Sequence, residues 1–153
     1  MMTFQQHNIQ TAEQLIQTID ELLQRTDTYR ERQRQMAAAA FDPSWYGDLQ
    51  PHIQVQHDGY LLELYERGVN MMSKKTTEAD DVIYWILEDV IFSHSYVLLM
   101  ETYNVDNITT HLRLTPEITA ELDGMVNAAF DSIGGVYQQW HQQGRRSELE
   151  RGR

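Results

Sequence analysis

Cysteine is absent from the 153 residues of this chain, and its absence removes several kinds of chemistry. The protein can form no disulfide, no thiolate nucleophile and no zinc site built on cysteine. A chain without cysteine fits a reducing compartment. The first seven residues, MMTFQQH, also lack the basic and apolar regions of a secretion signal. The sequence therefore predicts a cytoplasmic protein.

Recognised catalytic motifs are absent as well. The sequence holds no P-loop, no GxGxxG fingerprint, no GxSxG nucleophile elbow and no HExxH zinc motif. The six histidines are scattered, and the spacing of His94 from Glu88 and Asp89 puts the imidazole on a different helix face from Glu88. A carboxylate metal site is therefore only a remote alternative. We expect no enzyme activity, no metal and no cofactor.

Basic residues are few, with 12 Lys and Arg against 23 Asp and Glu. Residues 78–131 contain eleven of the acids and a single base, Arg113, so ten of the eleven net negative charges lie there. A localised negative field attracts basic partners and repels nucleic acid. Two interpretations stay open, because such acids either keep the protein soluble or bind a basic partner. The candidate contact residues are Asp80, Asp81, Asp106, Glu117, Glu121 and Asp123.

The most apolar segment runs from Asp80 to Tyr103 and contains neither glycine nor proline. A strand is typically about five or six residues long, so a segment of this length predicts a helix. Most of its circumference is apolar, which predicts burial on several faces. Its charged residues interrupt the pattern, and a membrane span needs roughly 20 predominantly apolar residues. We therefore expect the central helix of a folded core and no contact with a membrane.

Shorter patterns predict the elements on either side of this helix. Thr11 and Gln14 form a capping box at the start of a helix, and Thr115-Pro116 starts another near the C-terminus. Alternation of apolar and polar residues predicts three strands between residues 52 and 75, joined at Asp58-Gly59 and at Arg67-Gly68. These strands make a three-stranded antiparallel β-meander.

The predicted fold class is therefore α+β. It has an N-terminal helix, the meander, a long buried central helix and a C-terminal helix packed on the sheet. Residues 1–144 are expected to form one domain, and residues 145–153 a frayed charged tail. The arginine-rich stretch 25–34 is interpreted as a solvated helix face, with nucleic-acid binding as the alternative. Trp45 and Tyr46 are expected to cover the edge of the core, and a partner-binding role is the alternative.

Glu88 interrupts the apolar helix and needs an explanation. Carboxylates inside such a segment usually have a local partner, so we expect Glu88 to accept hydrogen bonds from Tyr or Trp donors within the fold. The alternative is a solvent-facing acidic stripe that docks on a basic partner.

Two segments resemble the immunity proteins of bacterial polymorphic toxin systems. They are LELYERG at 62–68 and YWILEDVIFS at 84–93, and they are similar to the type catalogued as immunity protein sixty-three over about residues 60–100. The resemblance implies a small cytoplasmic antidote that binds a secreted toxin domain and blocks it. It implies a structural role for the motif residues Tyr65, Glu66, Gly68, Trp85, Glu88, Asp89, Phe92 and Ser93.

Trp85 and Phe92 are seven residues apart, so both are expected on one helix face, aimed at the sheet. The partner that the resemblance implies is a cognate toxin domain, and a basic nuclease or nucleic-acid-modifying enzyme would suit an acidic inhibitor. Direct binding to nucleic acid is not expected. The alternative function is a non-enzymatic adaptor or regulatory protein that has no toxin partner.

Overall fold

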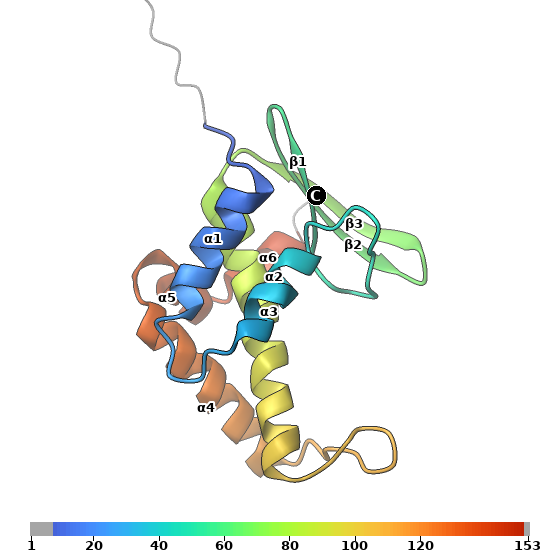
Figure 1. The fold of residues 1–153 in the computed structure, drawn as a ribbon, viewed down its shortest axis with the longest axis vertical. Helices are drawn as coiled ribbons and strands as arrows, with labels where there is room; N and C mark the ends of the chain where they lie inside the picture. Colours follow the sequence, from blue (N-terminus) through green and yellow to red (C-terminus); the bar gives the residue numbers. More distant parts are fainter. Residues whose placement is uncertain (1–7, 152–153) are drawn as a thin grey trace, which may run out of the picture.

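The computed structural model describes residues 8–151, which form six helices and three strands with the long helix α3 at the centre (Figure 1). In chain order they are α1 (Ala12–Leu23), α2 (Glu31–Ala39), β1 (His52–Gln56), β2 (Gly59–Glu66), β3 (Val69–Thr76), α3 (Ala79–Thr102), α4 (Pro116–Ile133), α5 (Gly135–Gln142) and α6 (Arg145–Arg151). The predicted α+β class is confirmed. The N-terminal residues from which we inferred that no secretion signal is present lie outside the described residues.

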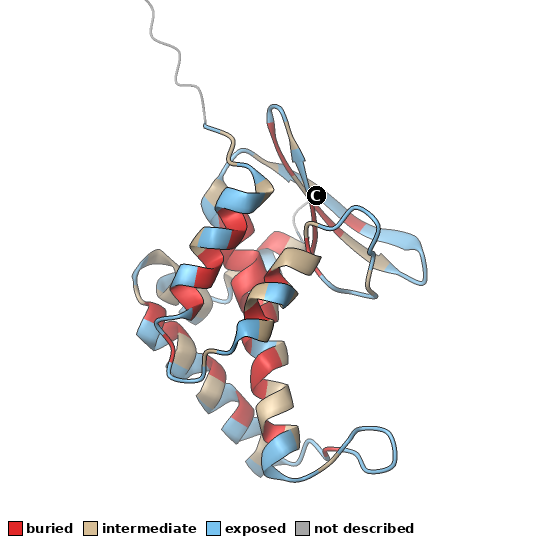
Figure 2. Cartoon of the chain, viewed as in Figure 1, coloured by how far each residue is buried: buried red, intermediate tan, exposed pale blue. Residues whose placement is uncertain are grey.

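The central helix α3 contacts each of the other helices and the middle strand, β2. Residues Val82–Leu87 and Val90–Ile91 are at most 2% exposed. Burial is densest in the half of α3 nearest the sheet, and exposed residues alternate with buried ones toward its C-terminal end (Figure 2). Apolar residues around the whole circumference are expected for a helix that is covered on several sides.

The prediction that the central helix is too short and too interrupted to span a membrane was wrong in one respect. Among the described helices, α3 is long and apolar enough to cross a membrane when only its length and composition are considered. However, 67% of the apolar stretch is buried inside the fold. The core helix of a folded protein has the same composition, and packing against the other elements accounts for the apolar character of α3.

The N-terminal helix α1 begins with the predicted capping box, in which Thr11 and Gln14 bond each other's backbone N–H groups. Its fully buried residues Leu15, Ile19 and Leu23 recur every four residues and form one apolar stripe. Through this stripe α1 joins the core that is centred on α3.

The arginine-rich stretch contains the start of a separate helix, α2, and it is not simply a solvated face. Arg32 on α2 donates a hydrogen bond to His94 on α3, and Arg34 pairs with the buried Asp20 on α1 at 3.1 Å. Arg30, just before the helix, pairs with Glu101 on α3. The arginines therefore connect α2 to its two neighbouring helices.

The three strands form an antiparallel sheet in the order β1-β2-β3, as the alternation predicts. Gly59 follows the first turn, and a side chain there would lie 2.8 Å from the carbonyl oxygen of Thr76 on β3. The second turn holds Arg67 and Gly68, both with positive φ, at 51° and 78°. This is the backbone that a two-residue β-hairpin favours, so the predicted turn role of Gly68 is confirmed.

The C-terminal helices pack mainly on α3. Thr115 caps α4 by accepting a hydrogen bond from the N–H of Ile118, with Pro116 at the first helical position. α4 packs against α3 and α1, and the C-terminal element that lies beside β3 is α6. Gly134 and Gly135, both with positive φ, separate α4 from α5.

The prediction of a frayed tail from residue 145 was wrong, because residues 145–151 form α6. Leu149 is 2% exposed, and Trp85 Nε1 on α3 donates to Glu150 Oε2 at 2.9 Å. Arg145 pairs with Asp81 of α3 at 2.6 Å. The segment is short and charged, so its own propensity is weak, and these contacts with α3 hold it in place. Residues 152 and 153 lie outside the described residues.

Candidate partner-binding surfaces

Glu88 accepts hydrogen bonds within the fold. Its Oε2 atom lies 2.5 Å from the hydroxyl of Tyr84 and 2.9 Å from Nδ1 of His141 on α5. The imidazole also reaches Asn127 on α4 and stacks on Phe130 at 4.2 Å between ring centroids. Burial and the nearby carboxylate raise the pKa of Tyr84 above its ordinary value. The carboxylate of Glu88 therefore joins α3, α4 and α5 and leaves no acidic stripe for a partner.

Asp81 is enclosed by the fold and is no part of the outer surface. Its two oxygens accept from Arg145 at 2.6 Å and from the hydroxyl of Thr76 at 2.9 Å. Because its carboxylate is already paired and buried, the prediction that Asp81 contacts a partner was wrong. The neighbouring Asp80 is exposed and accepts from the hydroxyl of Tyr137 at 2.7 Å.

Asp106 is exposed, but its carboxylate organises its own loop. One oxygen accepts from the backbone N–H groups of Ile108, Thr109 and Thr110, and the other accepts from the hydroxyl of Thr109. These bonds, led by that from the Thr110 backbone, hold the pKa of Asp106 well below its ordinary range. Its local role is therefore to fix the turn between α3 and α4.

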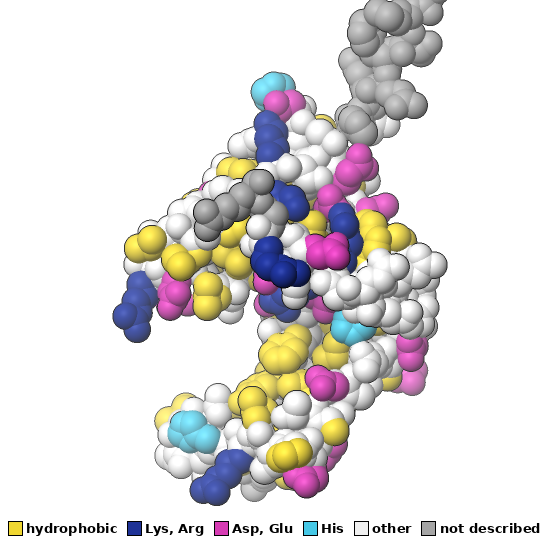
Figure 3. Space-filling view, turned by 180° about the vertical axis from the view of Figure 1, so that it is seen from behind, with side chains coloured by type: hydrophobic (Ala, Val, Ile, Leu, Met, Phe, Trp, Pro, Cys, Tyr) yellow, Lys and Arg dark blue, Asp and Glu magenta, His cyan; other side chains and the backbone are white. Residues whose placement is uncertain are grey.

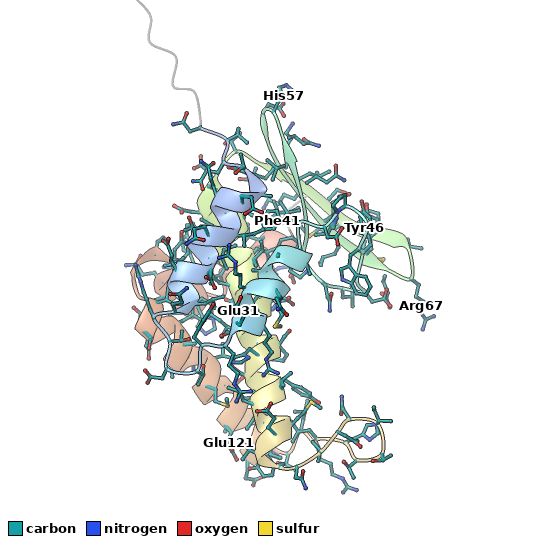
Figure 4. The ribbon with its side chains drawn as sticks, in the orientation of Figure 1. Glu31, Phe41, Tyr46, His57, Arg67 and Glu121 are labelled. Carbon is teal, nitrogen blue, oxygen red and sulfur yellow. The ribbon has the colours of Figure 1, made fainter. Side chains whose placement is uncertain are left out.

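The remaining predicted contact residues lie on α4. Glu117, Glu121 and Asp123 are exposed, and we call them the acidic edge of α4. Glu121 also accepts from the hydroxyl of Tyr103 at the end of α3. Figure 4 shows Glu121 on α4, on the side of the molecule away from Tyr46 and the 41–51 loop.

The six predicted contact residues do not form one surface. Asp80 lies in the first turn of α3, which has 24 residues and is therefore roughly 36 Å long at about 1.5 Å per residue. The acidic edge of α4 begins only after α3 has ended and the chain has passed through the 104–114 loop (Figure 1). A role in binding a partner stays a prediction for Asp80, Asp106 and the acidic edge of α4.

Most of the motif residues support the fold. Tyr65 donates to the buried Glu63 at 2.7 Å and packs edge-on against Tyr46. Trp85 is fully buried, and Ser93 is half-buried. Glu66 is exposed at the end of β2. Tyr65 and Trp85 therefore have clear structural contacts.

Phe92 is an exception, because 44% of its side chain is exposed. Its expected position in the core, facing the sheet beside Trp85, was wrong. Both residues lie on one face of α3, but α6 covers Trp85 and the cover ends before Phe92. Trp45, which was expected to cover the edge of the core, is likewise 55% exposed.

Asp89 lies on the same face, between Trp85 and Phe92. The carboxylate is half-buried, and within residues 8–151 no side chain or N–H donates a hydrogen bond to it. Burial raises its pKa above the ordinary value, the charge of the nearby Arg146 opposes the rise, and the charge of Glu150 adds to it. The Arg146 guanidinium itself pairs with Glu150 at 3.1 Å. Asp89 and Trp45 line one small cavity of about 20 Å³.

We call Asp89, Phe92 and Tyr96 the α3 outer face, because their spacing of three and four residues puts them on one side of the helix. This surface was not predicted from the sequence. Apolar residues surround the whole of α3, so the sequence does not reveal where its neighbours end. The only available signal was a carboxylate, Asp89, without an obvious partner in an apolar segment.

Within residues 8–151, no three His, Asp or Glu side chains are grouped so that they could hold a metal ion. The buried polar residues Glu88, Asp81 and Glu63 are committed to internal bonds. Within the described residues, the two candidate binding surfaces are the acidic edge of α4 and the α3 outer face.

The family follows from a comparison with family models. Residues 57–150 match the model described as Immunity protein 63, and the chain belongs to this family. Membership implies a toxin-inhibiting immunity function and a cognate toxin as partner, and immunity proteins are generally not enzymes. The match runs from the first β-turn into α6, well beyond the two motif segments. A comparison with curated proteins found no match, and neither did a comparison with solved structures.

Proposed function

We propose that this protein is the cytoplasmic antidote to a bacterial polymorphic toxin and that it neutralises the toxin domain by binding it directly. The observation that carries the proposal is the family match over residues 57–150. Inhibition by contact requires no catalytic group of the inhibitor. It requires a surface that fits the toxin and an affinity high enough to keep the toxin occupied.

The charge of the chain supports a basic toxin domain as the partner. The net charge is −11, and the acidic edge of α4 places three exposed carboxylates on one helix. Nucleases and nucleic-acid-modifying enzymes bind phosphate with basic clefts. Complementary charge raises the rate of association with such a cleft and disfavours wrong partners. The proposed inhibitor therefore approaches a basic surface of the toxin through electrostatic attraction.

The test is protection of cells together with formation of a complex. The toxin domain encoded beside the gene for this chain is expressed from an inducible promoter in a bacterial host, with and without this chain. We expect growth arrest only in its absence, and we expect the two purified proteins to elute as one complex. The control measures equal amounts of soluble toxin in both cultures. The proposal is wrong if growth also arrests in the culture that expresses this chain, at equal amounts of soluble toxin, and if the two purified proteins form no complex at micromolar concentration.

A further inference from the structure

Asp89 is a charged group for which the described part of the fold supplies no direct partner. Removing a carboxylate from water is costly unless it is paired or hydrogen-bonded. Within residues 8–151, Glu88 accepts two hydrogen bonds and Asp89 accepts none. The charge of Arg146 favours the ionised form of Asp89, but Arg146 is paired with Glu150, and the negative charge of Glu150 acts against it. A cation placed against Asp89 would relieve both the incomplete solvation and the repulsion.

Two exposed aromatic residues lie near Asp89. Phe92 follows one turn later with 44% of its side chain exposed, and Trp45, which lines the same small cavity as Asp89, is 55% exposed. Exposed aromatic residues beside a partly desolvated charge are typical of the residues that dominate binding energy at interfaces.

The α3 outer face lies on a hollowed side of the molecule. α6 contributes Arg146 and Glu150 near Asp89, and the 41–51 loop contributes Trp45, so this face points to the side on which α6 and that loop lie. Figure 3 shows this side hollowed between the sheet and the 104–114 loop, with hydrophobic side chains along its floor. Within the 104–114 loop, Ile108 and Leu114 are 82% and 58% exposed.

We propose that the α3 outer face is the docking site for a segment of the cognate toxin that places a cationic side chain against Asp89 and an apolar neighbour on Phe92. The inference rests on the proposed function and names the surface that carries it out. Arginine suits the site best, because its planar guanidinium binds a carboxylate through two hydrogen bonds and also stacks on an aromatic ring.

The test compares paired variants for their affinity toward the toxin domain encoded beside this gene. Asp89→Asn removes the charge and keeps the shape, and Phe92→Ala removes the exposed ring. Asp27→Asn removes an exposed carboxylate in the turn between α1 and α2, and Val55→Ala trims an exposed apolar residue on β1. We expect Kd to rise about tenfold or more for each of the first two variants, and by less than about threefold for the two controls.

Hydrogen exchange of the wild-type complex gives a second measurement that needs no variant. Binding at the α3 outer face should slow exchange in residues 89–96 and in the 41–51 loop more than in α4. Thermal melting of Asp89→Asn and Phe92→Ala should stay close to that of the wild type, since neither side chain has a direct bonding partner within the described fold. A loss of affinity in these variants is then caused by the changed docking surface and not by unfolding.

The outcomes separate this inference from the proposed function. The docking site is wrong if Asp89→Asn and Phe92→Ala bind the toxin as tightly as the wild-type chain does, and if the toxin slows hydrogen exchange in α4 instead of in residues 89–96. The proposed function stands in that case, because the wild-type chain still binds the toxin. If wild-type chain does not bind the toxin, both fail. If Asp89→Asn abolishes self-association in light scattering and leaves toxin affinity unchanged, the occupant is a second copy of this chain and the inference is also overturned.

Discussion

Glu88 and Asp89 are neighbours in the sequence, yet their carboxylates have opposite environments. Successive residues of a helix point about 100° apart, so Glu88 faces α4 and α5, and Asp89 faces the side of α6 and the 41–51 loop. The first carboxylate accepts from two donors, and the second accepts from none among residues 8–151. One dipeptide thus contributes a residue to the core and a residue to a surface.

The buried bond between Tyr84 and Glu88 should contribute measurably to stability. Replacing Tyr84 by Phe leaves the buried carboxylate without its shortest hydrogen bond, and hydrogen bonds to charged groups contribute about 2 kcal/mol. Urea denaturation should show a loss of about that size. Tyr103→Phe is a matched control, because the bond of Tyr103 to Glu121 is exposed. Removing this bond should change the free energy of unfolding by no more than experimental error. Equal effects for the two variants would contradict the structural role of Glu88.

His94 should make stability depend on pH. Its Nε2 atom lies 2.8 Å from the carbonyl oxygen of Thr28 and must donate, and its Nδ1 accepts from Arg32. The buried ring is therefore neutral, and burial, together with the charges of Arg32 and Arg30, lowers its pKa below the ordinary value of about 6.5. The bond to Thr28 opposes this shift only in part.

The direction of the pH effect follows from the lowered pKa. Below about pH 6.5 the unfolded chain binds a proton at His94 more readily than the folded chain does, so acid favours unfolding. The contribution of the neutral ring is fully present above that pH and is lost as pH falls toward the folded-state pKa. We expect His94→Gln, whose amide can make both bonds, to lose less stability than wild type between pH 7.5 and 5.5 in urea denaturation. Parallel losses in the two proteins would show that another group titrates.

At the scale of elements, α6 is held by α3 and should in turn stabilise it. Leu149→Ala removes a residue that is 2% exposed, and leucine-to-alanine changes in cores cost about 3 kcal/mol. Glu148→Ala changes an exposed residue of the same helix and should have little effect. Thermal melting compares the two variants. If Leu149→Ala melts at the wild-type temperature, α6 does not pack as described.

Elements with strong local patterns could be predicted from the sequence, and those held by distant residues could not. The capping box at Thr11, the alternation of β1 and β2 and the length of α3 are local properties of the chain. α6 forms because Trp85 and Asp81, more than 60 residues away along the chain, bond to it. The exposure of Phe92 depends on where α6 ends, which no pattern within α3 contains.

The candidate site follows the same rule. The excess of acids over residues 78–131 could be counted from the sequence, but the fold scatters these acids along α3, the 104–114 loop and α4. Burial then separates Asp81 from Asp80, although they are adjacent in the chain. Charge composition therefore predicts the sign of a partner better than it predicts the contact residues.

The charge of the whole molecule should appear in the kinetics of binding. With a net charge of −11, association with a basic toxin domain should slow about tenfold or more between roughly 50 and 500 mM salt, because ions screen long-range attraction. The dissociation rate should change much less. Surface plasmon resonance measures both rates, and Glu117→Gln with Glu121→Gln should reduce the salt dependence. An association rate that is flat with salt would exclude steering by these carboxylates.

The order of elements along the chain has a consequence for synthesis on the ribosome. α1, α2 and the strands leave the exit tunnel before α3, and folding generally proceeds from the N-terminus as the chain emerges. The helix whose composition would suit a membrane therefore meets some of its partners, α1, α2 and β2, already made. Residues 8–56 precede the stretch that matches the family, and we expect α1 and α2 within them to cover the most apolar helix of the nascent chain as soon as it emerges.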